Sequence, residues 1–101
     1  MRIPKRLKAF GREYAVVRDT HIADKVECWG FLDLLTDEIF MKKRSDENFP
    51  MTREKQVFMH EIIHIIDDNL KIGLDELQTQ RLAVGLITLI IANKLDFNDP
   101  S

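Results

Sequence analysis

The sequence predicts an α+β fold in which a small antiparallel sheet of three to four strands is followed by two C-terminal helices. Residues 5–43 contain short segments rich in β-prone side chains, separated by turn residues. Residues 52–70 and 76–93 then show helix caps, stop signals and apolar residues at helical spacing. A chain of 101 residues is the length of one ordinary domain, so we expect a single domain over residues 1–101.

Four strands are predicted in the N-terminal half. Residues 5–18, KRLKAFGREYAVVR, contain two β-prone runs on either side of a glycine, which predicts a hairpin. Residues 26–33 and 38–43 also alternate, and the polar pair Thr36-Asp37 between them is typical of a turn. Strands joined by short turns run antiparallel, so we expect one antiparallel sheet.

A long helix is predicted after the sheet. Pro50 and Thr52 mark its start, and the helical pattern continues to about Leu70, with Gly73 as a stop signal. At about 100° per residue, apolar side chains cover most of the helix surface. The remaining polar strip contains both histidines of the segment HEIIH at residues 60–64.

A second helix is predicted to begin after Asp75. This residue can act as the N-cap, and Gln78 at position N3 completes a capping box. The helix is expected to run to about Asn93. Its apolar run at residues 82–92 has 11 residues, and because a membrane-spanning helix needs about 20, we expect a buried helix. The alternative interpretation is that this run contacts a partner or a second copy of the chain.

Composition excludes several classes of protein. The chain is 45% hydrophobic and 32% charged with a net charge of −2, which is typical of a folded domain and gives no electrostatic reason to expect nucleic acid. The single cysteine, Cys28, excludes an internal disulfide and a cysteine-rich metal site. The N-terminal residues lack the pattern of a signal peptide. We therefore expect a cytoplasmic protein, and nothing in the sequence indicates its oligomeric state.

The segment HEIIH has the residue types and spacing of a metal site. His60 and His64 are four residues apart, so their imidazoles lie one above the other on a helix and can bind one ion. Glu61 is turned about 100° around the axis, where it can reach a metal-bound water and act as general base. Zn²⁺ lowers the pKa of such a water, which favours metal-assisted hydrolysis of an amide. The alternative is an amphipathic helix whose exposed strip holds these residues by chance.

A hydrolytic zinc site needs a third protein ligand and an open fourth position. His21, the only other histidine, is expected in a solvated loop. Asp68 follows His64 by four residues, which places it about 6 Å further along the helix axis, too far to meet the same ion. Asp67 has the same difficulty. Both acids are expected to cap the helix end, support a ligand imidazole or face solvent.

Glu76, at the start of the second helix, is the preferred third ligand, with Asp75 and Gln80 as alternatives. The competing interpretation of Glu76 is an acid that only complements the helix macrodipole. If the second helix ran straight back from the first, Gln80 or Ala83 would lie level with the metal. The loop at residues 71–74 must therefore turn back toward the histidines for Glu76 to reach them.

The segment HEIIHIIDDNLKIGLDELQTQRLAVGL resembles the short zincin-like metallopeptidases encoded by phages and prophages, which are related to the ImmA/IrrE-type gluzincins. In that family, HExxH is followed by a second helix that opens with Glu-x-x-(Ala, Val or Thr) and continues with a Leu-Ala pair. Glu76 and Thr79 match this opening, and Leu82-Ala83 match the pair. The upstream segment WGFLDLLTDEIFM is similar to the family's aromatic-glycine strand and the edge strand that follows it.

The resemblance implies a zincin-like α+β core with His60, His64 and Glu76 as zinc ligands and Glu61 as general base. It also implies that a peptide substrate lies along the edge strand, which would be residues 38–43, and pairs with it through main-chain hydrogen bonds. The substrate that it implies is a phage or host regulatory protein.

Two further interpretations remain open. One is a catalytically silent binding module that keeps the zincin fold and acts on a phage or host regulatory protein. For the catalytic interpretation, Arg81 is a candidate for stabilising an oxyanion, although a surface position is the stronger interpretation of it.

The second open interpretation is that the metal is purely structural. The open fourth position argues against it, because structural zinc sites are closed by four protein ligands. Imidazole and carboxylate ligands also accept metals other than zinc.

Overall fold

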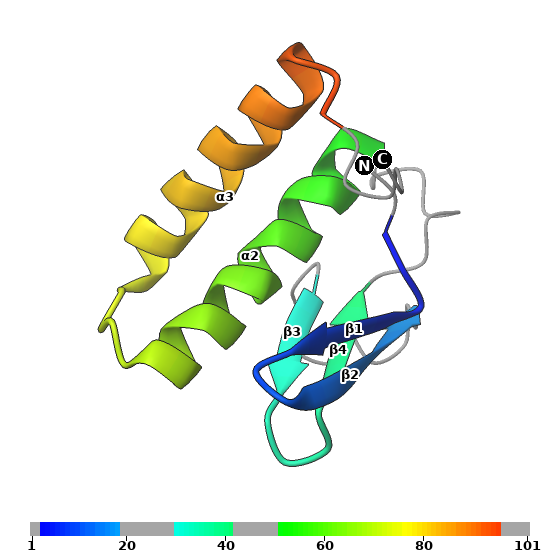
Figure 1. The fold of residues 1–101 in the computed structure, drawn as a ribbon. Coiled ribbons are helices and arrows are strands. Elements are labelled where there is room, and N and C mark those ends of the chain that lie inside the picture. The colour runs from blue at the N-terminus through cyan, green and yellow to red at the C-terminus, as the bar shows by residue number, and fades with distance from the viewer. Residues whose placement is uncertain (1–2, 19–29, 42–50, 96–101) are drawn as a thin grey trace.

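The computed structural model describes residues 3–18, 30–41 and 51–95, which form a four-stranded sheet and two helices (Figure 1). The strands are β1 (Arg6–Ala9), β2 (Arg12–Arg18), β3 (Gly30–Asp33) and β4 (Glu38–Met41). The helices are α2 (Met51–Leu70) and α3 (Glu76–Ala92). This order confirms the predicted α+β class, with the sheet first and both helices after it.

The predicted boundaries hold closely within the described residues. Both predicted helices and all four strands are present. Strand β3 ends at Asp33, β4 begins at Glu38 and α2 ends at Leu70, as the sequence pattern predicts. Helix α2 begins at Met51, so Thr52 lies inside the helix and is not its N-cap. The following predictions lie outside the described residues: those for His21, Cys28, Pro50 and the strand residues 26–29 and 42–43.

The sheet has the strand order β1-β2-β4-β3 and is mixed. Each predicted hairpin is antiparallel, whereas β2 and β4 pair in parallel. The sheet thus differs from the expected antiparallel one at its central pair, because the second hairpin joins the first through β4. This strand carries three consecutive buried apolar residues, Ile39, Phe40 and Met41, which suits a position inside the sheet.

Strand β3 lies at an edge of the sheet. The prediction that residues 38–43 form the edge strand is wrong, because β4 is paired on both sides, with β2 and with β3. Strand β3 is only partly buried, and it ends at Asp33. The Oδ1 atom of Asp33 accepts hydrogen bonds from the backbone N–H groups of Leu35 (2.9 Å) and Thr36 (3.4 Å), which closes the turn into β4.

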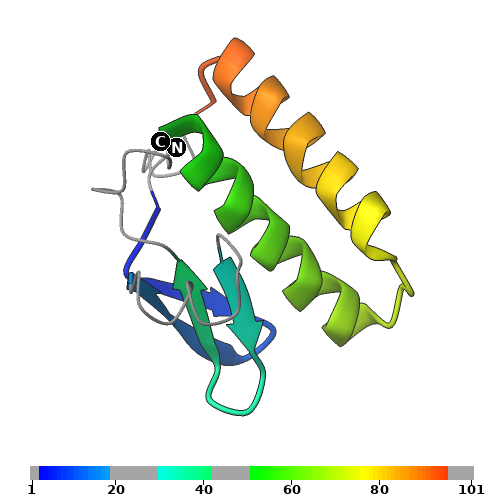
Figure 2. The same ribbon diagram turned by 180° about the vertical axis from the view of Figure 1, so that it is seen from behind.

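Helix α2 lies between the sheet and α3 (Figure 1, Figure 2). Two apolar clusters hold it there. The cluster on the sheet side contains the buried residues Tyr14, Ile39, Met41, Phe58 and Ile65. The cluster on the α3 side contains the buried residues Met59, Ile63, Ala83, Ile87 and Ile90. With two sides buried in this way, α2 presents a third side, which carries His60 and His64 of the HEIIH motif.

Helix α3 is buried along one stripe only. Its buried residues are Thr79, Ala83, Ile87 and Ile90. Leu82, Leu86 and Leu89 are between 42% and 59% exposed, so the prediction of a buried helix holds for one face of the apolar run and not for the other. Among the helices in the described part of the chain, none is long and apolar enough to cross a membrane.

Gly30 allows β3 to approach α2 closely. A Cβ atom at this position would lie 2.7 Å from Val57 Cγ1 and 2.8 Å from the carbonyl oxygen of Phe40. Both distances are shorter than van der Waals contact, so a larger residue would push β3 away from α2. Because Gly30 and His60 line the same cleft, this close approach places the edge strand beside the motif.

We predict that Gly30→Ala lowers the free energy of unfolding by about 1–3 kcal/mol, because the added methyl group overlaps Val57 and a strand carbonyl. The matched control is Gly85→Ala in α3, where a Cβ atom meets nothing within 4 Å. This substitution should raise stability by about 0.5–1 kcal/mol. Urea denaturation of both variants measures the difference, and an unchanged midpoint for Gly30→Ala would contradict the close packing of β3.

Candidate metal site

Helix α2 presents His60 and His64 on the same side, one turn apart. Their Nε2 atoms are 3.0 Å apart, and their rings meet edge to face with the centroids 4.7 Å apart. The side chains are 15% and 28% exposed, respectively. The two imidazoles are thus half-enclosed and still open to a ligand on the same side.

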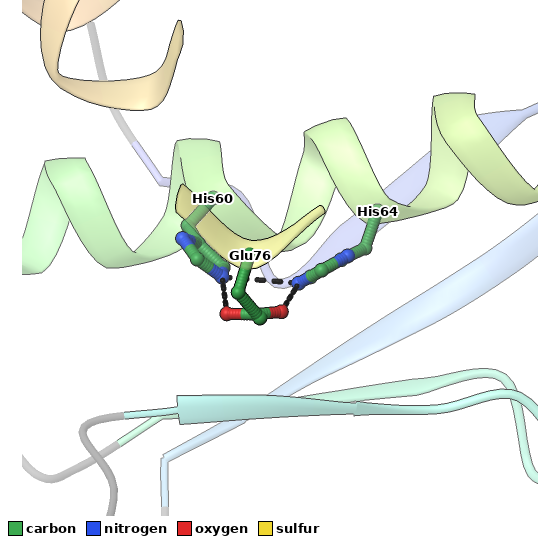
Figure 3. A group of neighbouring side chains, drawn as sticks. All are labelled: His60, His64 and Glu76. Atoms are coloured by element: carbon green, nitrogen blue, oxygen red, sulfur yellow. Dashed lines mark hydrogen bonds and ion pairs between the residues drawn. The ribbon is translucent and has the colours of Figure 1, made fainter. Parts of the chain in front are cut away.

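Glu76 joins the two histidines from α3 (Figure 3). Its Oε2 atom is 3.2 Å from His60 Nε2, and its Oε1 atom is 2.8 Å from His64 Nε2. One ligand atom from each of the three residues lies within 4.8 Å of the others. The structure therefore brings together the three residues that the sequence suggested as metal ligands.

The loop between the helices turns back toward the histidines because Asp67 holds it. The Oδ1 atom of Asp67 accepts hydrogen bonds from the backbone N–H groups of Gly73 (2.7 Å) and Leu74 (3.1 Å). Its carbonyl oxygen accepts a third from the N–H group of Ile72 (3.3 Å). Lys71 and Gly73 adopt positive φ angles of 53° and 87°, which reverse the chain direction. This geometry supplies the turn that Glu76 needs.

A capping box then fixes the first turn of α3. Asp75 Oδ1 accepts a hydrogen bond from the N–H group of Gln78 (2.7 Å), and the N–H group of Asp75 donates to Gln78 Oε1 (3.0 Å). The predicted cap is thus confirmed. Because the Asp75 side chain is engaged in the cap, it stands outside the group of ligand atoms. Glu76 follows it directly, so the cap sets the direction from which Glu76 approaches.

Gln80 orients His60 and is not one of the grouped ligands. The Nδ1–H group of His60 donates a hydrogen bond to Gln80 Oε1 (2.8 Å). This bond leaves the Nε2 lone pair of His60 free to face the ligand group, and imidazoles that bind metals typically have such a partner on the other nitrogen. The sequence suggested Gln80 only as an alternative ligand. Gln80 follows Glu76 by four residues, which places both side chains on the same face of α3.

The donor set fits a divalent metal ion, for which zinc gives the reference distances. Two ligand atoms at 2.0–2.2 Å from one ion and at a tetrahedral angle lie about 3.3 Å apart. The two imidazole Nε2 atoms are 3.0 Å apart, each lies 2.8–3.2 Å from one of the two Glu76 carboxylate oxygens, and one ligand atom from each residue lies within 4.8 Å of the others, so a small shift of the side chains would bring all three to this spacing. Two imidazole nitrogens and one carboxylate, with a fourth position left open, are the ligands of hydrolytic zinc sites. The same donors also accept other divalent metals.

Glu61 lies buried beside this group. Its side chain is 4% exposed, and it lines the same cleft as both histidines and Glu76. Burial, and to a smaller extent the negative charge of Glu76, raise the pKa of the Glu61 carboxyl group from 4.5 to about 8. A cation nearby has the opposite effect and favours the carboxylate. Glu61 is therefore placed where a bound cation would control its protonation.

The group opens into a cleft of about 540 Å³ between α2 and the edge strand β3. Gly30 and Phe31 line it from the strand side, and Asp67 and Asp68 line it beyond the histidines. The Asp68 side chain is 42% exposed and lies 3.8 Å from Lys71, and it is not part of the group of ligand atoms. Arg81 is exposed and lines neither this cleft nor the smaller one next to it.

The site combines three features: a group of side chains that can bind a metal ion, a buried carboxyl group beside it, and an open cleft. Comparison of the chain with models of known protein families, with curated proteins and with solved structures finds no significant match. The residues themselves can bind a divalent cation, hold an acid–base group next to it, and admit a ligand along β3.

We predict that Gln80→Leu weakens metal binding, measured with zinc as the probe, by about tenfold to a hundredfold, because His60 loses the acceptor that fixes its ring. The matched control is Gln56→Leu. Gln56 precedes His60 by one helical turn and lies near the site without a hydrogen bond to either histidine. Competition against a chelating dye gives both affinities, and equal affinities for the two variants would show that the hydrogen bond to His60 does not support metal binding.

Proposed function

We propose that this chain is a zinc-dependent metallopeptidase that hydrolyses a peptide bond of a protein substrate in the cytoplasm. The observation that carries the proposal is the convergence of His60, His64 and Glu76 beside the buried Glu61. The resemblance of the HEIIH segment and its following helix to the phage-encoded zincin-like metallopeptidases supports it. A phage or host regulatory protein is the corresponding substrate.

His60, His64 and Glu76 would hold the zinc ion, and Glu61 would move the proton. When bound, zinc acts as a Lewis acid and lowers the pKa of a water molecule. The Glu61 carboxylate accepts a proton from the attacking water and passes it to the nitrogen of the leaving amine. The zinc ion would favour the carboxylate form of Glu61, which is the form that accepts the proton.

Strand β3 would orient the substrate. It lies at an edge of the sheet, and its residues Gly30, Phe31 and Leu32 line the cleft that contains the ligand group. A peptide that pairs with this edge through main-chain hydrogen bonds would lie extended past the site. The role that the resemblance gave to residues 38–43 therefore passes to β3.

A binding module that keeps this site without catalysis is the second candidate, and one observation favours it. Peptide hydrolysis needs a donor that stabilises the oxyanion. The only tyrosine of the chain, Tyr14, is fully buried in the sheet-side core. Among the described residues that line the larger cleft and the smaller one beside it, the only lysine or arginine is Arg53.

We predict that Glu61→Gln keeps bound zinc and loses cleavage by a factor of about 10² to 10⁴, because the amide cannot take up the proton. Cleavage of a mixed fluorogenic peptide library measures the loss. The control is Glu13→Gln on β2, an exposed acid paired with Arg6, which should cleave at the wild-type rate. Equal cleavage by the Glu61 variant would rule out its role as general base.

A further inference from the structure

Two clefts meet at the candidate metal site. The larger one, of about 540 Å³, and a smaller one, of about 220 Å³, share four lining residues: Gly30, His60, Glu61 and Glu76. They extend from these shared residues in opposite directions along α2. Together they form one groove with the ligand group near its middle. Figure 3 shows β3 passing alongside α2 at this point.

One end of the groove is acidic. We call this end, beyond His64, the acidic arm, and its charged lining residues are Asp67 and Asp68. Asp67 uses its Oδ1 atom to accept the hydrogen bonds from the interhelical loop. Asp68 lies 3.8 Å from Lys71, but the Lys71 side chain is 82% exposed, and such surface pairs are weak. The Asp68 carboxylate is thus available to a cationic group in the groove.

The other end is basic. We call it the basic arm, and beyond the shared residues it is lined by Arg53, Gln56, Val57 and Gln80. Arg53 is exposed. It forms no ion pair with another described residue, so its guanidinium group is available to a carboxylate.

The macrodipole of α2 has the same direction as these side-chain charges. Arg53 lies in the first turn of α2 and Asp68 in its last turn, and the acid in the first turn, Glu54, is buried and paired with Arg18. The N-terminus of a helix carries a partial positive charge and the C-terminus a partial negative one. The partial positive charge at the start of α3 is offset by Asp75 and Glu76. The groove is therefore polarised along its length by the backbone as well as by side chains.

The direction of β3 gives the direction of a bound peptide. Gly30 lines both arms, whereas Phe31, Leu32 and Leu34 line only the acidic arm, so β3 runs toward that arm. Antiparallel pairing is slightly more stable than parallel pairing. A peptide antiparallel to β3 has its N-terminal part in the acidic arm and its C-terminal part in the basic arm.

The spacing of the charges sets their distance from the scissile bond. Arg53 precedes Glu61 by eight residues and Asp68 follows it by seven, which corresponds to about 12 and about 10 Å along the helix axis. An extended peptide advances about 3.3 Å per residue. The two charges therefore lie about three residues on either side of the reacting bond.

We propose that the groove selects peptide segments with a basic residue about three positions before the scissile bond and an acidic residue about three positions after it. The inference rests on the proposed function for the position of the scissile bond. The preference itself is a property of binding, which can be measured without cleavage.

The test uses zinc-loaded Glu61→Gln protein and two fluorescein-labelled peptides of the same composition. One has two lysines near its N-terminus, two glutamates near its C-terminus and about four uncharged residues between them, so that the inner charges lie three positions from the central bond; the other has the charges reversed. Fluorescence polarisation should show about tenfold tighter binding of the first peptide at low salt, and the difference should shrink at high salt. Equal affinities, or no binding of either peptide, would overturn the inference.

Charge-swapped variants locate the preference. Arg53→Glu combined with Asp68→Lys keeps the net charge and should favour the reversed peptide. Lys8→Glu combined with Glu13→Lys, on the β1-β2 hairpin, also keeps the net charge and should leave the preference unchanged. If the first double variant does not fold, Asp68→Asn and Arg53→Gln should each reduce the preference.

Cleavage by the wild type separates this inference from the proposed function. If the first peptide binds more tightly but neither peptide is cleaved, the selectivity of the groove stands and the peptidase proposal fails. If both peptides are cleaved and bound equally, the peptidase proposal stands and the inference is overturned.

Discussion

The hydrogen bonds that Asp67 accepts from the interhelical loop determine where α3 begins, and the candidate site depends on that position. The Glu76 side chain is 74% exposed, so burial does not hold it against the histidines. The braced loop and the capping box at Asp75 direct it there instead. The third ligand is thus set by backbone geometry several residues before it, and the apolar contact between α2 and α3 keeps the two helices in register.

The electrostatics of the site are unfavourable without a cation. Glu61 is buried next to the negatively charged Glu76, and both effects oppose its ionisation. Natural sequences tend to violate such local rules at functional sites, where another interaction compensates for the cost. A divalent cation between the histidines and Glu76 would compensate here. It would at the same time restore Glu61 to the charged form that a general base requires.

Most of the fold could be predicted because its signals are local. The capping box at Asp75 and the periodicity of α2 each lie within a few residues. The edge strand could not be predicted, since alternation shows that a strand exists and not which strands it pairs with. Whether Glu76 or Gln80 reaches the histidines as a ligand depends on the conformation of the interhelical loop. That loop contains a positive φ angle at Lys71, and a lysine in the sequence does not indicate such an angle. The supporting roles of Asp67 and Gln80 likewise depend on tertiary contacts.

The most direct test is the metal content of the purified protein, measured by elemental mass spectrometry after zinc is supplied and excess is removed. We expect about one zinc ion per chain in the wild type, and loss of that zinc in both His64→Ala and Glu76→Ala. Asp68→Ala, which removes an acid next to the group, should retain it. A wild-type protein that holds no zinc would contradict the metal site, and a Glu76→Ala variant that retains it would contradict the third ligand.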